Sequence, residues 1–118
     1  MTPSKAPWRV RLTTAAETDF RDILQWTAEH FGEAQARAYA ETLSMALAAL
    51  AAGPTAIGAK PRNDIAKGMF SFHVTRTGRK GRHFVIFRVA GEQDAAIEVL
   101  RLLHDSMDLP RHLLAGEE

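Results

Sequence analysis

Residues 14–53 read TAAETDFRDILQWTAEHFGEAQARAYAETLSMALAALAAG, and this stretch decides the fold. On each side of Gly32 its apolar residues recur at the three- and four-residue spacing of one helix face. A connection of one residue favours an antiparallel helix hairpin. The expected apolar stripes are Phe20, Ile23, Leu24, Thr27 and Phe31 in the first helix, and Ala36, Tyr39, Ala40, Leu43, Leu47 and Leu50 in the second.

The ends of both helices are marked by local signals. Thr14 and Glu17 match a capping box, in which a hydroxyl and a carboxylate each bond an unpaired amide, so the first helix is predicted from Thr14 to about His30. Glu33 opens the second helix with a carboxylate in its first turn, which suits the helix dipole. The Gly-Pro pair at 53–54 ends it.

Strand-like alternation flanks the hairpin on both sides. Trp8 to Thr13 alternates between apolar and polar residues, which is typical of a half-buried strand. Residues 55–68 are predicted to be a loop punctuated by glycine and proline. Three further strands are expected at about 69–75, 82–89 and 95–104, separated by hairpin turns at 78–81 and 91–94.

The last of these runs is apolar on both faces, with Ile97, Val99 and Leu103 expected on one face and Leu100 and Leu102 on the other. It is therefore predicted to be a central strand. The resulting fold class is α+β, a helix hairpin packed on a mainly antiparallel sheet in the order β-α-α-β-β-β. Asp108 is expected to cap a short C-terminal helix that ends at Leu114.

The length of 118 residues fits one domain, predicted at 8–114, with a flexible leader at 1–7 and a tail at 115–118. The chain has no cysteine, which excludes disulfides and thiolate chemistry. Neither a signal peptide nor an apolar run long enough to cross a bilayer is recognisable, so a cytoplasmic protein without a membrane partner is expected. The histidine spacing indicates no metal site, and no cofactor is expected.

Positive charge is concentrated between residues 60 and 88. Eight basic residues stand there against Asp64 alone, a net charge of +7, while the rest of the chain carries −6. Such a patch favours an acidic protein segment or a nucleic acid as partner, although a solvated sheet edge that uses charge against aggregation is an alternative. The basic surface expected to bind a target or regulator comprises Arg76, Arg79, Lys80, Arg82 and Arg88.

The second helix is unusually apolar on the face opposite its stripe, at Ala34, Ala38, Met45, Ala49 and Ala52. Alanine is the best helix former, so the pattern can reflect helix propensity alone. The other interpretation is a docking face for a partner helix or a second copy of the chain. Its expected contacts are Ala38, Met45 and Ala49, together with Trp26, which lies off the stripe of the first helix and otherwise caps the sheet edge.

The candidates for catalysis are Arg82, Arg101 and His104, with His83 nearby. Cleavage of RNA needs a base for the 2′-hydroxyl proton, an acid for the leaving oxygen and cations for the charged phosphorane. Strand alternation favours structural roles instead, since His83 alternates with apolar residues and His104 ends a strand. Catalysis is the less favoured interpretation.

In its order of elements the chain resembles the ParE/RelE superfamily of bacterial type II toxins, and within it the ParE branch. The resemblance covers residues 8–113. The matching residues are Leu12, Asp19-x-x-Asp22-Ile23, Phe31-Gly32-x-x-x-Ala36, Tyr39, Leu43, Leu47 to Pro54, Arg82 to Arg88 and Val99-Leu100-Arg101-Leu102-Leu103-His104.

This resemblance implies a toxin held inactive by a cognate ParD-like antitoxin, with DNA gyrase as target and replication as the blocked process. RelE-type members instead cleave mRNA on the ribosome, and they carry a dense basic set with a C-terminal aromatic residue. Here Asp105 follows His104, and no tyrosine occurs after Tyr39. A non-enzymatic gyrase inhibitor is therefore favoured over an mRNA interferase, and a non-toxic module that only binds antitoxin is a third interpretation. Either a homodimer or a toxin–antitoxin hetero-oligomer fits.

Overall fold

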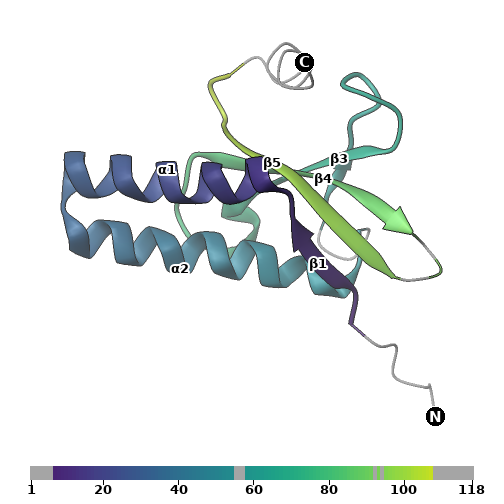
Figure 1. The fold of residues 1–118 in the computed structure, drawn as a ribbon, viewed down its shortest axis with the longest axis horizontal. Coiled ribbons are helices and arrows are strands. Elements are labelled where there is room, and N and C mark those ends of the chain that lie inside the picture. Colours follow the sequence, from purple (N-terminus) through teal and green to yellow (C-terminus); the bar gives the residue numbers. More distant parts are fainter. Residues whose placement is uncertain (1–6, 55–57, 92, 94, 108–118) are drawn as a thin grey trace.

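Five strands form one sheet in the order β1-β5-β4-β3-β2 (Figure 1). The computed structural model describes residues 7–54, 58–91, 93 and 95–107. β1 runs parallel to β5, and the other neighbouring strands are antiparallel. The predicted α+β class and the central position of the last strand are confirmed. The strands are β1 (Arg9–Leu12), β2 (Lys60–Pro61), β3 (Met69–His73), β4 (His83–Gly91) and β5 (Ala96–His104).

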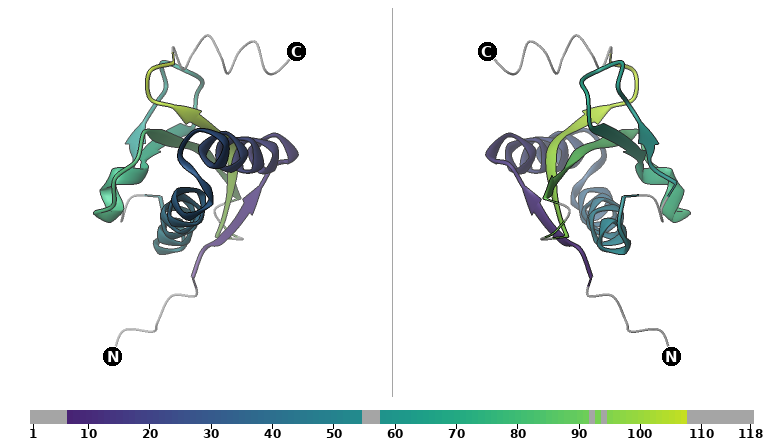
Figure 2. Two further views of the ribbon diagram at one scale, coloured as in Figure 1. Left: turned by 90° about the vertical axis from the view of Figure 1, so that its left-hand side faces the viewer. Right: turned by 90° about the vertical axis from the view of Figure 1, so that its right-hand side faces the viewer.

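The helix hairpin consists of α1 (Thr14–Phe31) and α2 (Glu33–Ala49), and a 3-10 helix, η1 (Leu50–Ala52), continues α2. Gly32 alone joins the two helices with a φ of 95°, a conformation that glycine adopts without steric cost. Figure 2 views the hairpin almost end on and shows the sheet curving around it. The hairpin therefore covers one face of the sheet.

The capping residue of α1 is Thr13 rather than the predicted Thr14. The Thr13 hydroxyl accepts a hydrogen bond from the Ala16 amide at 3.1 Å and donates one to the Leu100 carbonyl at 3.0 Å. β1 ends beside Val99, so this carbonyl of β5 has no strand neighbour on that side. A buried strand carbonyl needs a partner, and the hydroxyl of Thr13 supplies it.

Two apolar clusters hold the layers together. The smaller one, on the sheet face away from the hairpin, contains Ile65, Met69, Ile86 and Leu103. The larger one lies between the hairpin and the sheet and contains Ala16, Leu43, Ala46, Leu50, Phe72, Val74, Val85, Phe87, Ile97, Val99 and Leu102. Most of the predicted stripe residues pack against it.

Phe31 is the exception among the stripe residues, because its side chain is 63% exposed. The far end of the hairpin projects past the strands (Figure 1), so no sheet lies over the last turn of α1. The prediction that Phe31 belongs to the core is therefore wrong.

A β-bulge in β5 corrects the predicted alternation. Ile86 of β4 pairs with Arg101 and Phe87 pairs with Val99, so Leu100 is an extra residue in β5. The bulge reverses the side-chain phase beyond it. Consequently Leu102 shares the helix-facing cluster with Val99, whereas Leu103 lies on the opposite face of the sheet.

Several boundaries also differ from those expected. The predicted loop at 55–68 contains the two-residue strand β2, and the strand predicted to Thr75 ends at His73. There a 3-10 helix, η2 (Val74–Thr77), begins and leads into Gly78 in the left-handed conformation. The expected C-terminal helix and tail, and nearly all of the expected leader, lie outside the described residues.

None of the helices in the described ranges is long and apolar enough to cross a membrane.

Candidate partner-binding groove

A groove of about 1040 Å³ opens between the hairpin and the adjoining ends of β4 and β5. It forms because the hairpin is longer than the sheet is wide, which leaves the inner side of its far half without strands (Figure 1). On the hairpin side it is lined by Asp19, Asp22, Ile23, Trp26, Thr27, Phe31, Gln35, Ala38, Tyr39 and Thr42. On the sheet side it is lined by Arg79, Lys80, Gly81, Arg82, His83, Arg101, Leu102, Leu103, His104, Ser106 and Met107.

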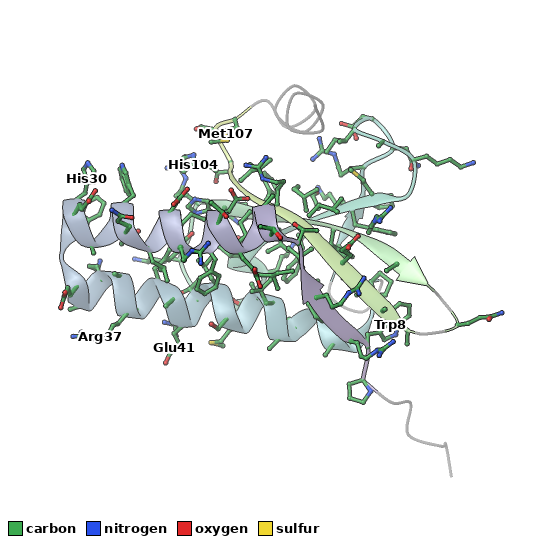
Figure 3. The ribbon with its side chains drawn as sticks, in the orientation of Figure 1. Trp8, His30, Arg37, Glu41, His104 and Met107 are labelled. Carbon is green, nitrogen blue, oxygen red and sulfur yellow. The ribbon has the colours of Figure 1, made fainter. Side chains whose placement is uncertain are left out.

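An exposed group of rings occupies the outer end of the groove. The Trp26 and His30 rings stack with centroids 4.2 Å apart, and the Phe31 ring meets Trp26 edge on at 5.7 Å. The His30 Nδ1 lies 2.9 Å from the Trp26 carbonyl, so it donates a hydrogen bond there. Figure 3 shows His30 at this end of α1, away from the sheet. Trp26, His30 and Phe31 are called the aromatic tip below.

Trp26 therefore does not cap the sheet edge, because its side chain is 53% exposed. Nor do the four residues expected to form one docking face lie together. Ala38 lines the groove with Trp26, but Met45 and Ala49 are not among the lining residues. Ala49 packs against the core, and Met45 is 43% exposed on α2.

A partly buried tyrosine–histidine pair closes the inner end of the groove. The Tyr39 hydroxyl accepts a hydrogen bond from the Arg82 amide at 3.1 Å and lies 2.7 Å from His83 Nδ1. The direction of this second bond follows the tautomer of His83: when the hydroxyl donates to Nδ1, the proton of the neutral imidazole lies on Nε2. Burial above all, and the nearby His104 in second place, lower the pKa of His83 to about 4. Burial also raises the pKa of Tyr39.

Asp105 ties the ends of three strands together. Its carboxylate accepts from Arg82 at 3.0 Å and from His73 Nε2 at 2.9 Å. These hydrogen bonds, the one from Arg82 above all, lower the pKa of Asp105 to about 2. The guanidinium of Arg82 therefore has a carboxylate partner within the chain, while its side chain stays 67% exposed.

Arg101 is paired in the same way with Asp19 of α1. Its Nε and Nη2 donate to the two carboxylate oxygens at 2.8 and 3.0 Å, and the Leu102 amide donates to the same carboxylate at 2.9 Å. Asp19 thus accepts a hydrogen bond from the backbone of β5 beyond the end of β1, where Thr13 donates one to the Leu100 carbonyl. This contact holds the start of α1 on the sheet and also raises the pKa of Arg101.

The five residues predicted to form a basic surface are only partly brought together. Arg79 donates to Thr42 at 2.8 Å and pairs with Glu41 at 3.1 Å, which fixes it on α2. Arg88 pairs with Glu98 at 2.8 Å and does not line the groove.

Among the described ion pairs none involves Lys80 or Arg76. Lys80 stands on the groove rim beside Arg82, whereas Arg76 is exposed in η2 outside the groove. Part of the charge at the groove rim is therefore paired within the chain, and Lys80 is a rim cation that takes part in none of the described ion pairs.

Arg82, Arg101 and His104, the low-ranked catalytic candidates, do line one groove together with His83. The His83 and His104 rings meet edge to face with centroids 5.3 Å apart. His104 Nδ1 is engaged by the Ser106 hydroxyl at 2.7 Å, the local bonding expected of a structural histidine. Within the described residues no cluster of His, Asp or Glu is arranged to hold a metal ion.

Sequence reasoning missed the partners that neutralise these arginines. In the sequence Asp105 counts only as a departure from the RelE-type pattern after His104, and its pairing with Arg82 across 23 residues has no local signal. Asp19 was noticed only through the resemblance, because its partner Arg101 lies 82 residues away.

The protein-family model described as the ParE toxin of type II toxin–antitoxin systems (parDE) matches residues 10–109 of this chain. The chain belongs to the ParE toxin family. Toxin ParE of Escherichia coli is 33% identical over 102 residues, covering 86% of this chain and 89% of that relative. Toxin ParE1 of Mycobacterium tuberculosis (strain H37Rv) is 33% identical over 105 residues, covering 89% and 97%.

Solved structures agree with ParE membership at the level of the fold. The chromosomal ParDE toxin–antitoxin system of P. aeruginosa gives a TM-score of 0.67 at 18% identity, covering 82% of this chain and 95% of the other. The toxin–antitoxin complex RelBE2 of Mycobacterium tuberculosis gives 0.59 at 22% identity, covering 87% and 97%. This ParE-family chain is thus a type II toxin with the predicted RelE/ParE-like fold.

Proposed function

We propose that this toxin acts by binding a protein, that its target is DNA gyrase, and that a ParD-like antitoxin neutralises it. The observation that carries the proposal is the groove, which has exposed aromatic side chains at one end and in which four of the six charged lining residues are paired within the chain. Exposed apolar patches of this kind mark protein-binding surfaces. Gyrase is named from family membership, since the groove itself does not identify a target.

The internal pairing of Arg82 and Arg101 argues against RNA cleavage. A phosphorane needs cations that are available to it, yet both guanidiniums already bond carboxylates. His83, with a pKa of about 4 and its Nδ1 occupied by Tyr39, is a weak general base at neutral pH. The convergence of two histidines and two arginines in one groove still makes an mRNA interferase the second candidate.

An antitoxin partner is supported by charge as well as by family. The hairpin carries six carboxylates and two arginines between residues 14 and 49, a net charge of −4, whereas residues 60–88 carry +7. An acidic antitoxin segment is expected to approach the groove from the side of Lys80 and Arg82. Two of the structural neighbours are themselves toxin–antitoxin complexes.

The test is a parallel pair of assays on the purified full-length chain freed of its antitoxin. We expect loss of gyrase supercoiling while ribosome-bound mRNA stays intact, and we expect antitoxin to restore supercoiling. Cut mRNA with normal supercoiling would replace gyrase inhibition by the interferase. Inactivity in both assays, with antitoxin still bound tightly, would favour the non-toxic binding module.

A further inference from the structure

We propose that the aromatic tip and Asp22 are the contact through which this toxin engages its target protein, and that they receive a basic side chain of the target together with its apolar surroundings. The inference rests on the proposed function, because it takes the toxin to act by binding a protein. It assigns the outer end of the groove to the target and leaves the inner, basic rim to the antitoxin.

The fold does not need the exposed rings of the tip. Among the described large apolar side chains Phe31 and Trp26 are the most exposed, at 63% and 53%, and neither belongs to a core cluster. Exposure of two large aromatic side chains side by side is unfavourable in water unless a partner covers them. Aromatic residues, tryptophan above all, dominate the energetics of protein interfaces.

The rings are held in place before any partner arrives. His30 stacks on Trp26 and bonds its carbonyl, while Phe31 packs against the edge of the indole. Both contacts lie within α1, so their geometry depends on helix spacing and not on distant elements. Side chains ordered in advance lose little conformational entropy on binding, which is the property of a binding hot spot.

Charge identifies the kind of partner. Asp22 lies one helical turn before Trp26 on the same groove wall, and none of the ion pairs among the described residues involves it. A carboxylate beside an indole suits an arginine or lysine, which can pair with the carboxylate and stack on the ring. At the same end of the hairpin Glu29 and Glu33 outnumber Arg37, so an acidic antitoxin segment is disfavoured there.

The experiment compares two variants of the full-length chain with two matched controls. The double variant Trp26→Ala/Phe31→Ala removes the exposed rings, and Asp22→Asn removes the carboxylate. Arg37→Ala truncates a large exposed side chain at the same end of the hairpin but outside the groove (Figure 3). Arg21→Gln neutralises the residue next to Asp22, which also does not line the groove.

Three quantities are measured for each protein: the concentration that half-inhibits gyrase supercoiling, growth arrest on induction without antitoxin, and affinity for the antitoxin. We expect the ring variant to need about 30-fold more protein for inhibition, as the loss of an interface hot spot worth about 2 kcal/mol implies. Asp22→Asn should weaken gyrase inhibition less than the ring variant does, and neither variant should arrest growth. Antitoxin affinity should change by less than about 3-fold, and the controls should behave as the parent chain.

Any other outcome overturns a specific part of the proposal. Ring variants that inhibit gyrase normally, or that lose antitoxin affinity as strongly as inhibition, would overturn the assignment of the tip to the target. A homodimer that the ring variant dissociates would make a second copy the occupant. A further outcome is a parent chain that arrests growth without inhibiting gyrase, while the ring variant no longer arrests growth. In that case gyrase is the wrong target and the assignment of the tip to the target stands. A parent chain that arrests nothing overturns both.

Discussion

At the scale of single residues, the groove is shaped by polar side chains that bond to one another across long stretches of sequence. Asp19 holds Arg101, Asp105 holds Arg82, and Tyr39 holds His83. The first pair joins α1 to β5, the second joins the end of β5 to the start of β4, and the third joins α2 to β4. The same contacts engage the two arginines and the His83 imidazole that a nuclease would need, which links local pairing to the choice of function.

The depressed pKa of His83 predicts a pH-dependent stability. Its pKa falls from the usual 6.5 to about 4 on folding, so the unfolded chain binds more protons between these values and stability is lost as pH falls through this window. Urea unfolding of the His83→Gln variant should show a flatter pH dependence between about 4 and 6.5 than the parent chain.

The contrasting variant for this test is Asp105→Asn. The pKa of Asp105 falls from 3.8 to about 2, so its contribution is lost at lower pH, between these values. Removal of the Asp105 carboxylate should therefore flatten the pH dependence of the free energy of unfolding below about pH 4. A His83→Gln profile parallel to that of the parent chain would show that His83 is not held neutral by the fold.

At the scale of elements, the connection from η2 to β4 packs directly on α2. A β-carbon added at Gly81 would lie 2.3 Å from Val74 Cγ2 and 3.0 Å from the Tyr39 hydroxyl. Val74 is fully buried, so it has little room to move away. The close approach of this connection to α2 is what places Lys80, Arg82 and His83 along the groove.

Gly81→Ala should therefore destabilise the chain by about 1–3 kcal/mol, the usual cost of overpacking a filled core. It should also weaken the Tyr39–His83 contact. Chemical denaturation measures the free-energy change. Gly32→Ala is the contrasting variant, because a β-carbon there meets nothing within 4 Å and only the backbone, with a φ of 95° and a ψ of 164°, opposes it, at a cost of about 1–3 kcal/mol. It should leave the Tyr39–His83 contact intact. A loss at Gly81 well below about 1 kcal/mol would contradict tight packing of the connection.

At the scale of the whole molecule, charge is divided between an acidic hairpin and a basic sheet, yet much of it is paired across that division. Arg79 reaches Glu41 on α2 and Arg101 reaches Asp19 on α1, so these bonds attach the hairpin to the sheet side. Lys80 is an exposed cation at the groove rim that takes part in none of the described ion pairs. Reversal of Arg79 would disturb the fold as well as the surface, whereas reversal of Lys80 tests the surface alone.

Lys80→Glu should slow association with an acidic antitoxin by several-fold, with little change in thermal stability, because charges at the rim of an interface act mainly on the association rate. The effect should shrink as salt is raised. Lys67→Glu makes the same charge change within the basic stretch but outside the groove, and it should matter less. Surface plasmon resonance at two salt concentrations measures both. Equal effects of the two reversals would indicate that only net charge steers the antitoxin.

Local patterns predicted both long helices and four of the five strands of this protein, but not β2, η2 or the contacts between elements. The helix stripes and the alternating strands predicted the α+β class, the hairpin and the central β5, because burial follows periodicity along the chain. The predicted capping residue of α1 was wrong, because Thr13 also makes a long-range hydrogen bond to the Leu100 carbonyl. The predicted face of Leu103 was wrong because of the β-bulge at Leu100. A one-residue irregularity reverses every later side chain in a strand.

The sequence by itself determined the fold class, the family and the concentration of basic residues between 60 and 88. Only the tertiary structure decided which charges are available and where a partner can bind. It paired Arg82 and Arg101 with carboxylates, and it left Trp26 and Phe31 exposed beyond the edge of the sheet. The physical reason is that periodicity reports which side of an element is buried, whereas pairing and exposure depend on how far apart in space folding places residues that are distant in sequence.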